Sequence, residues 1–231
     1  MPQIKAVLFD KDGTLFDFHA TWGAWCKKLL LENSAGDAKL AAQMGNVIGY
    51  DLDTGEFAKD SIVIAHTPTE IAALLLPFFP QETITELTKR LNDAAATVPL
   101  VEAIKLRPFL QNLKNRDLKL GVATNDGEIP TLAHLTSAGI QDMFDFIAGS
   151  DSGFGAKPQT GMLLAFLQQT GLKPDQVAMV GDSMHDLVAG RDAGMICVAV
   201  LSGIATRQDL LPYADVILKD IGHLSDWLQS A

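Results

Sequence analysis

Two acidic side chains follow the first apolar stretch of this sequence. Asp10 and Asp12 come directly after residues 6–9, which are Ala-Val-Leu-Phe. Two carboxylates two positions apart at the end of a strand repel each other, which raises the proton affinity of one of them unless a cation lies between. Such a pair suits one nucleophile and one general acid or base. The same pattern is also typical of an Asp-rich turn that caps a strand.

A second acidic pair follows a later apolar stretch. Asp182 and Asp186 come after residues 177–180 and lie four positions apart across an expected helix start. On a helix they face the same way, and like charges at that spacing destabilise it by roughly a few tenths of a kcal/mol. The helix dipole offsets part of this cost, and a bound metal would offset more. An N-cap aspartate beside a solvated one is the alternative interpretation.

Four further residues are suited to holding a phosphate. Gly13 allows the chain to turn sharply and lets a backbone N–H approach an anion closely. Thr124 and Asn125 end an apolar run just before an expected helix, where hydroxyl, amide and backbone N–H groups can hold phosphoryl oxygens. The same two residue types are ordinary helix N-caps. Lys157 precedes a proline, and on its own it is typical of a solvated loop lysine.

The elements that must position these residues alternate along the chain. Short apolar runs predict strands at residues 6–9, 118–123, 144–148, 177–180 and 196–201, with a weaker one at 215–218. Helical periodicity predicts helices at residues 108–116, 129–138, 160–170 and 183–193. This alternation indicates an α/β fold, a Rossmann-like three-layer core with a mostly parallel sheet. In such a sheet the ligand lies beyond the carboxyl ends of the strands, where all of these polar residues fall.

One long segment breaks this alternation. Residues 16–103 contain almost no strand-like runs, and their pattern predicts helices at residues 19–32, 38–44, 69–78 and 81–98, with a turn at 51–55. We therefore expect a helical cap domain of residues 16–103, inserted into a catalytic core of residues 1–15 and 104–231. A lid tied to the core by two crossings can close over a site at the strand ends.

Composition limits the partners. The chain has 231 residues and a formal net charge of −10, and its 18 basic residues form no cluster. This argues against nucleic acid or an anionic membrane as a partner. A phosphate ester would approach such an acidic protein slowly unless a local cation reversed the field at the site. Two cysteines, no apparent signal peptide and no run of about 20 apolar residues predict a cytoplasmic protein with two buried thiols.

Taken in order, the motifs resemble those of the haloacid dehalogenase-like superfamily, and within it the phosphoglycolate phosphatase-like branch with a helical cap. The resemblance spans residues 10–14, Thr124-Asn125, Lys157-Pro158 and residues 181–186. It implies a phosphatase that hydrolyses a small phosphomonoester, a phosphorylated metabolite, through an aspartyl-phosphate. Asp10 would be the nucleophile. Asp12 would protonate the leaving alkoxide and then activate the water that hydrolyses the intermediate.

The resemblance also implies a Mg²⁺ site. Its ligands would be the Asp10 carboxylate, the Asp12 backbone carbonyl and the Asp182 carboxylate, with Asp186 reaching the ion through water or holding the shape of the site. Gly13, Thr124 and Asn125 would bind the phosphate. Lys157 would neutralise charge on the transferring phosphoryl group and on Asp10.

Two alternative functions stay open. A sugar-phosphate mutase of the same superfamily commonly has a histidine in the first cap helix where this chain has Trp22. A phospholigand-binding protein without catalysis would have no reason to keep several repelling carboxylates together.

Phe18 stands where phosphoglycolate phosphatases often carry a hydroxyl residue, which points to a different or bulkier leaving group. Trp22 and Trp25 are expected to pack on one helix face, and Lys11 to point away from the flanking carboxylates.

Overall fold

A six-stranded parallel sheet forms the centre of the molecule. The computed structural model describes residues 3–230. Its strand order is β3-β2-β1-β4-β5-β6, and all five neighbouring pairs are parallel. The strands are β1 (Ala6–Phe9), β2 (Lys119–Ala123), β3 (Phe146–Ala148), β4 (Val177–Gly181), β5 (Ile196–Val200) and β6 (Val216–Leu218). The six stretches predicted as strands form this sheet, and the predicted α/β fold class is confirmed.

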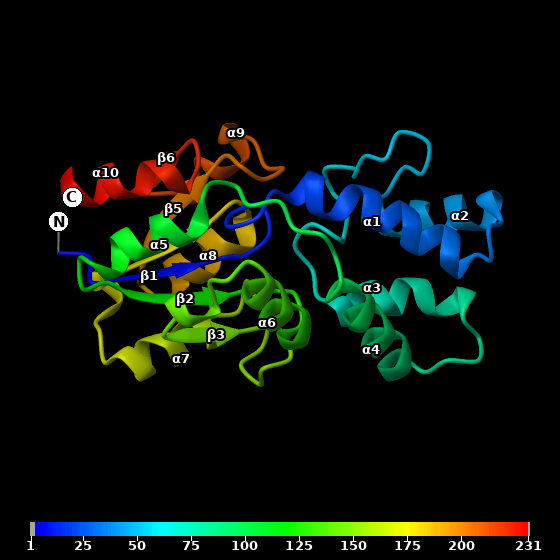
Figure 1. Ribbon diagram of the computed structural model, residues 1–231, viewed down its shortest axis with the longest axis horizontal. Helices are drawn as coiled ribbons and strands as arrows, with labels where there is room; N and C mark the ends of the chain where they lie inside the picture. The colour runs from blue at the N-terminus through cyan, green and yellow to red at the C-terminus, as the bar shows by residue number, and fades with distance from the viewer. Residues whose placement is uncertain (1–2, 231) are drawn as a thin grey trace.

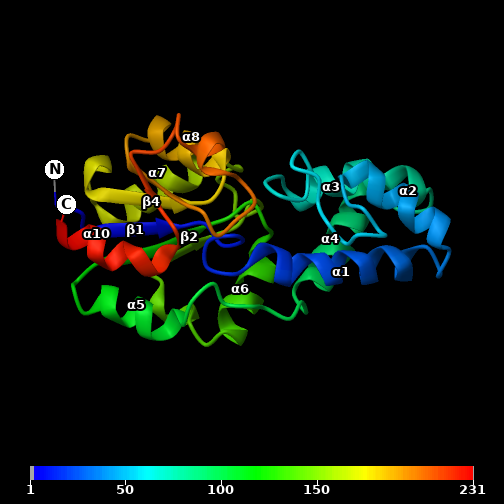
Figure 2. The same cartoon turned by 90° about the horizontal axis from the view of Figure 1, so that it is seen from above.

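Helices cover both faces of the sheet and make three layers (Figure 2). One face carries α5 (Leu106–Lys114), α6 (Glu128–Ser137) and α10 (Leu224–Ser230), and the other carries α7 (Gly161–Thr170), α8 (Met184–Asp192) and α9 (Arg207–Leu210). Side-chain alternation along β1 explains both contacts. Val7 packs in the same apolar cluster as α5 and α6, whereas Leu8 packs with α7. Because both faces are buried, the strands are continuously apolar.

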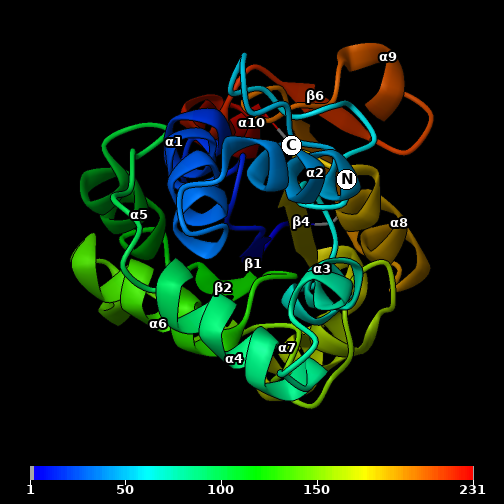
Figure 3. The ribbon, with the colours of Figure 1, turned by 90° about the vertical axis from the view of Figure 1, so that its right-hand side faces the viewer.

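Four helices lie together beyond one end of the sheet (Figure 1). They are α1 (Phe18–Asn33), α2 (Ala38–Ile48), α3 (Pro68–Leu75) and α4 (Ile84–Ala95). They share an apolar core of their own, which contains Leu30, Met44 and Leu87 and is separate from the core under the sheet. Figure 3 shows these helices in front of the strands when the molecule is viewed along the sheet. We propose that residues 16–103 form a cap domain around this second core.

The two chain crossings between cap and core run side by side. The Ala103 N–H donates to the Leu15 carbonyl at 2.9 Å, and the Asp17 N–H donates to the Val101 carbonyl at 2.8 Å. Phe16 also forms an isolated antiparallel bridge to Glu102. The paired crossings give the cap one narrow connection to the core, next to the end of β1.

Several boundaries differ from the sequence predictions for local reasons. The helix predicted from residue 81 begins at Ile84, because the Thr83 side chain accepts the Glu86 N–H and Glu86 returns the bond in a capping box. The turn at residues 51–55 is held by the Asp51 carboxylate, which accepts two backbone N–H groups. The short helices α9 and α10 were not predicted. Neither were the 3₁₀ helices Gln141–Met143, Pro174–Gln176 and Ile221–His223, whereas the 3₁₀ helix Leu76–Phe78 follows α3 directly and completes the helix predicted at residues 69–78.

Two further predictions concern the cysteines and membrane-spanning segments. Cys26 and Cys197 are buried free thiols, as predicted. Within residues 3–230, the longest apolar helical stretches fall short of what a membrane crossing requires.

Candidate active site

Asp10 stands at the carboxyl end of β1, at the centre of the sheet. Its backbone N–H donates to the Val180 carbonyl at 2.8 Å, which continues the pairing of β1 with β4. Its carboxylate Oδ1 accepts a hydrogen bond from Lys157 Nζ at 2.6 Å. Asp10 is buried, with 8% of its surface exposed, and Lys157 is buried still more deeply. The sheet therefore fixes this carboxylate against a single buried ammonium group.

Two more carboxylates join Asp10. One oxygen each from Asp10, Asp182 and Asp186 lies within 4.8 Å of the others. Asp182 follows β4, the neighbour of β1, and accepts the Thr14 hydroxyl at 3.2 Å. Asp186 lies in the first turn of α8, and both of its oxygens are engaged. Oδ1 accepts from Lys157 Nζ at 2.5 Å, and Oδ2 accepts from the Ser183 N–H at 3.0 Å and hydroxyl at 2.7 Å.

Burial and mutual repulsion shift the proton affinities in this cluster. Burial raises the pKa of Asp10 to about 7; Lys157 opposes this shift, and the charge of Asp186 adds to it. Burial also raises the pKa of Asp182 well above its ordinary value, with Asp10 contributing further repulsion. Burial acts to lower the pKa of Lys157, but the charges of Asp10 and Asp186 outweigh it and raise that pKa. Lys157 is thus held as a cation.

The donor set fits a hard divalent cation. Three carboxylates surround one ammonium group, so two negative charges have no compensating partner in the cluster. A divalent ion carries that charge, and Mg²⁺ prefers oxygen ligands, using one or two carboxylates and keeping some water. Because Lys157 and Ser183 already engage the oxygens of Asp186, this residue fits an outer position better than Asp10 or Asp182. The structure itself describes protein atoms alone.

Gly13 serves the site differently from the sequence interpretation. Its N–H donates to the Phe16 carbonyl at 2.7 Å, so this group is not open to a phosphate in the structure. Its φ of 81° lies in the left-handed region, which favours glycine. A Cβ at this position would lie 2.4 Å from Asp182 Oδ2. Gly13 therefore makes room for the Asp182 carboxylate.

Thr124 and Asn125 follow β2, the other neighbour of β1. The Thr124 hydroxyl oxygen accepts the Asp126 N–H at 3.1 Å, which leaves its own O–H to donate. The Asn125 side chain accepts the Lys157 N–H at 2.8 Å and donates to the Lys157 carbonyl at 2.8 Å. It also donates to the Ala65 carbonyl of the cap at 2.6 Å. In the structure Asn125 therefore holds Lys157 and a cap loop, and Thr124 is the better placed of the two to meet a phosphoryl oxygen.

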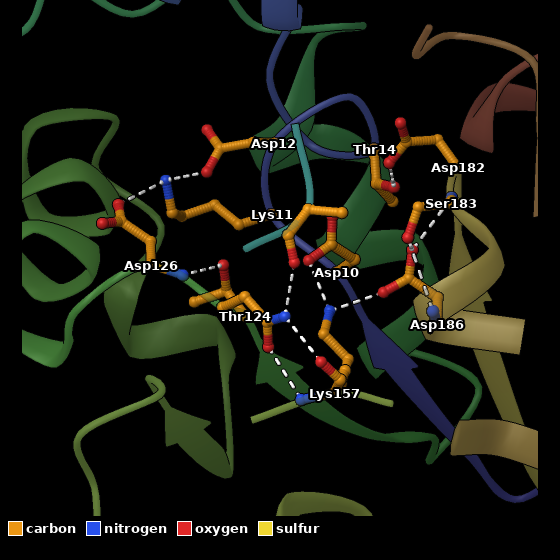
Figure 4. Close-up of polar contacts among 12 residues, drawn as sticks. Asp10, Lys11, Asp12, Thr14, Thr124, Asp126, Lys157, Asp182, Ser183 and Asp186 are labelled. Carbon is orange, nitrogen blue, oxygen red and sulfur yellow. Dashed lines mark hydrogen bonds and ion pairs between the residues drawn. The ribbon is translucent and has the colours of Figure 1, made fainter. Parts of the chain in front are cut away.

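A second buried ion-pair group lies beside the first (Figure 4). Lys11 is fully buried, and its Nζ lies 2.6 Å from Asp12 Oδ2 and 3.1 Å from Asp126 Oδ2. The other Asp12 oxygen accepts the Trp22 indole N–H at 2.9 Å. Trp22 belongs to α1, so the Asp12 carboxylate is held from the core on one side and from the cap on the other.

His134 completes this second group. Its Nδ1 lies 3.1 Å from Lys11 Nζ, and its Nε2 lies 2.8 Å from the Ala95 carbonyl at the end of α4. Burial lowers the pKa of His134, and the Lys11 charge lowers it further, which favours the neutral ring. A neutral ring with its proton on Nε2 donates to Ala95 and accepts from Lys11. Two cap elements thus contact the group that holds Asp12.

The prediction that Lys11 points away from both carboxylates was wrong for Asp12. Strand alternation holds as far as Asp10, but β1 ends at Phe9 and the chain turns at Asp12 and Gly13. Asp12 therefore swings to the side of Lys11, away from Asp10 (Figure 4). A lysine two residues after a buried strand was the available signal, because a buried lysine requires an anionic partner.

A cavity joins these residues to the cap. It is lined on one side by Asp10, Asp12 and Lys157, and on the other by side chains from α1, α3 and α4 and the loop before α3. Trp22 and Trp25, interpreted as packing residues, both line it. His66 and His185 reach it as well, with ring centroids 5.6 Å apart. The site is therefore a covered cleft at the sheet's carboxyl edge.

The fold and the site together define a class. A parallel sheet whose central strand ends in a buried Asp–Lys pair, with further carboxylates from the next strand and a helical insertion after the first, is the arrangement of a capped α/β hydrolase. The sequence comparison specifies the family. A family model described as "Haloacid dehalogenase-like hydrolase" matches residues 7–200, and the chain belongs to this family.

Individual relatives agree with this assignment. A protein of Rhodospirillum rubrum named phosphoglycolate phosphatase is 28% identical, over 97% of this chain and 90% of that protein. A haloacid dehalogenase-like hydrolase of Bacteroides fragilis has a similar fold, with a TM-score of 0.72 and 22% identity over 96% of this chain and all of that one. A β-phosphoglucomutase of Clostridium difficile has a TM-score of 0.69 at 18% identity, over 99% of this chain and 96% of that one. The predicted resemblance to this superfamily is confirmed.

Proposed function

We propose that this protein is a Mg²⁺-dependent phosphatase that hydrolyses a small phosphomonoester, in the manner of phosphoglycolate phosphatases, through a phosphorylated Asp10. The observation that carries the proposal is the buried Asp10 carboxylate at the end of the central strand, 2.6 Å from Lys157 and within 4.8 Å of two more carboxylates. Relatives named as phosphatases support it. Buried free thiols and the lack of a basic cluster support action in the cytoplasm on a small metabolite.

The chemistry divides into two steps. A carboxylate oxygen of Asp10 attacks phosphorus, the bond from phosphorus to the alcohol oxygen breaks, and Asp12 gives its proton to that oxygen. Asp12 then takes a proton from water, which attacks the same phosphorus and releases inorganic phosphate and free Asp10. Lys157 and the Thr124 hydroxyl balance charge on the phosphoryl oxygens throughout. Bound Mg²⁺, held by Asp10, the Asp12 carbonyl and Asp182, would neutralise charge on the phosphoryl group.

The acid step needs a change at Asp12. Both of its oxygens accept hydrogen bonds in the structure, one from Lys11 and one from Trp22. The leaving oxygen must replace one of these contacts. Trp22 is the contact that a movement of the cap changes, whereas Lys11 is the adjacent core residue and stays in place. Lys11 is therefore proposed to position Asp12 while Trp22 is exchanged for substrate.

Release of phosphate from an aryl phosphate and an alkyl phosphate, with and without divalent metal, tests the function. We expect multiple turnovers in Mg²⁺ and loss of activity in EDTA. Transfer of the phosphoryl group between positions of a sugar phosphate, faster than release of phosphate, would instead indicate the mutase suggested by the C. difficile fold relative. Tight binding of phosphate esters with no turnover in any divalent metal would indicate a binding protein.

Metal binding should depend on pH in a defined direction. Folding raises the pKa of Asp10 from 3.8 to about 7, so between these values the folded protein holds more protons than the unfolded chain. This contribution makes the metal-free protein less stable as pH rises from 4 to 7. Mg²⁺ displaces those protons, so saturating Mg²⁺ should raise Tm by roughly 5 to 10 °C at pH 8 and by much less at pH 5.

Thermal unfolding of wild type and Asp182→Asn, each with and without Mg²⁺, measures this linkage. The variant has one fewer buried carboxylate, so its metal-free stability should fall less steeply with pH and Mg²⁺ should stabilise it little. Equal Mg²⁺ effects on wild type at pH 5 and pH 8 would contradict the assignment of these carboxylates as ligands.

The positioning role of Lys11 gives a second prediction. Lys11→Met alone leaves the buried Asp126 without its cation, which threatens folding. The double variant Lys11→Met/Asp126→Asn removes both charges and keeps the shape. We expect it to fold and to lose up to roughly 10²-fold in kcat on an alkyl phosphate, because Asp12 is no longer held.

Asp126→Asn alone is the matched control, since it retains the 2.6 Å contact between Lys11 and Asp12. It should keep nearly full activity. A structural role of Lys11 would lower activity on all esters equally, whereas a positioning role spares bond cleavage in esters whose leaving group needs no proton. In single-turnover experiments, an equal loss in the rate constant for cleavage of alkyl and electron-poor aryl phosphates would therefore exclude a positioning role of Lys11.

A further inference from the structure

The part of the cavity that faces away from Asp10 is almost entirely apolar. Apart from His66 and Asn92, every cap residue that lines it has an apolar side chain. Trp22 and Trp25 form one wall, with their ring centroids 5.0 Å apart in an edge-to-face arrangement. Aliphatic side chains form the rest, among them Leu29, Ile48, Ile71 and Leu75. This half of the cavity receives whatever is esterified to the phosphate that Asp10 attacks.

Charge in the cavity is confined to its catalytic end. Among the described residues that line it, Lys157 is the one lysine or arginine, and Asp10 and Asp186 already pair with it. A leaving group with a carboxylate would therefore lie in the apolar half with no cation to meet it. Burial of an unpaired charge or of several unpaired hydroxyl groups is strongly unfavourable. Acidic and sugar leaving groups fit this lining poorly.

One buried polar atom of the cap residues that line the cavity lacks a hydrogen bond. Asn92 of α4 is 8% exposed, and its Oδ1 has no hydrogen bond within the described part of the chain. That oxygen has almost no accessible surface, so it offers a ligand in the cavity no hydrogen bond. The cavity has a volume of about 100 Å³, the order of magnitude of the roughly 150 Å³ apolar cavity that holds a benzene ring.

We infer that the substrate is a phosphomonoester of an apolar, ring-containing alcohol. The inference rests on the proposed phosphatase function and specifies its leaving group. The ring lies against Trp22 and Trp25, its hydrocarbon surface against the aliphatic wall, and its ester oxygen beside Asp12. Phosphoglycolate, whose leaving group carries a carboxylate, is then a poor substrate.

Three alkyl esters test the class. We expect kcat/KM for 2-phenylethyl phosphate to exceed that for 2-phosphoglycolate and for glucose 6-phosphate by roughly 10²-fold or more. Equal or better turnover of phosphoglycolate or the sugar ester would overturn the inference and leave the phosphatase function standing.

A charge placed in the cavity provides a matched pair of variants. Ile64→Arg puts a cation into the lining from a partly exposed loop position, and Val47→Arg puts the same charge on the exposed outer face of α2. Ile64→Arg should lower kcat/KM for the phenylethyl ester at least tenfold and raise it for phosphoglycolate. Val47→Arg should change neither. Equal effects of the two variants on kcat/KM would contradict the assignment of this cavity as the site of the leaving group.

Binding of 2-phenylethanol separates this inference from the function itself. Because Trp22 and Trp25 line the cavity, the alcohol should change tryptophan fluorescence at saturable concentrations, and Ile64→Arg should weaken this binding. If the alcohol binds but no phosphate ester turns over in any divalent metal, the phosphatase proposal fails and the apolar site stands. If esters turn over but the alcohol produces no saturable signal, the inference about the leaving group fails.

Discussion

Asp10→Asn is expected to lose roughly 10⁴-fold or more in kcat, because an amide oxygen does not replace the attacking carboxylate. The fold should survive the change. Burial raises the pKa of Asp10 to about 7, so the site already disfavours the ionised form, and a neutral side chain of the same shape relieves repulsion from Asp186. Lys157 keeps Asp186 as a partner at 2.5 Å. Asp10→Asn should therefore lose activity while its Tm stays close to that of wild type, with both quantities measured on the same preparation.

The intermediate gives the decisive measurement for Asp10. Wild-type enzyme quenched in acid during turnover should yield a peptide containing Asp10 that carries one phosphoryl group, and the variant should not. Asp10→Ala guards against slow conversion of asparagine back to aspartate. Asp37→Asn makes the same chemical change at an exposed cap position, where asparagine is also a good N-cap, and should leave turnover unchanged. Retention of a tenth of wild-type activity by Asp10→Ala would exclude Asp10 as nucleophile.

The positions of the carboxylates at the strand ends were predictable, because the local sequence pattern determines where each strand ends. An apolar run predicts a buried parallel strand, and the next residue must emerge at the carboxyl edge of the sheet. Asp10 and Asp182 meet for this reason, as neighbouring strands β1 and β4 end side by side. Lys157, on the loop after β3, needed the family resemblance in addition, because loop geometry is not encoded in hydrophobic periodicity.

Contacts that depend on turns or on the cap were not predictable. The pairing of Lys11 with Asp12 arises where β1 ends, and its second partner Asp126 lies after a different strand. Asn125 reaches the Ala65 carbonyl only because the cap loop folds over the site. The apolar cavity likewise forms where side chains of α1, α3 and α4 meet in the tertiary structure. The sequence pattern of each helix does not specify that arrangement. The sequence predicted the acidic residues at the carboxyl edge of the sheet, and the tertiary structure was needed to find the cap side of the cavity.

Asp12→Asn is expected to slow turnover of an alkyl phosphate by roughly 10² to 10⁴-fold, the usual contribution of a general acid or base. The side chain keeps its shape and one oxygen, which faces the buried Lys11 ammonium, so the amide nitrogen loses the hydrogen bond from Trp22. Folding should persist because Lys11 keeps Asp126 as an anionic partner. An alkoxide leaves poorly without a proton, which makes formation of the aspartyl-phosphate slow. The readout is kcat for an alkyl ester at saturating Mg²⁺, and a loss below tenfold would contradict the role.

An electron-poor aryl phosphate separates the two duties of Asp12. Its phenolate leaves without a proton, so the variant should still phosphorylate Asp10 quickly. Hydrolysis of the intermediate lacks its base, so it becomes rate-limiting. Rapid mixing should then give a burst of phenolate equal to the enzyme concentration, followed by slow turnover. If Asp12→Asn shows no burst and turns over both esters slowly, Asp12 acts before the attack by Asp10, for instance by holding the metal. It is then not the acid and base proposed.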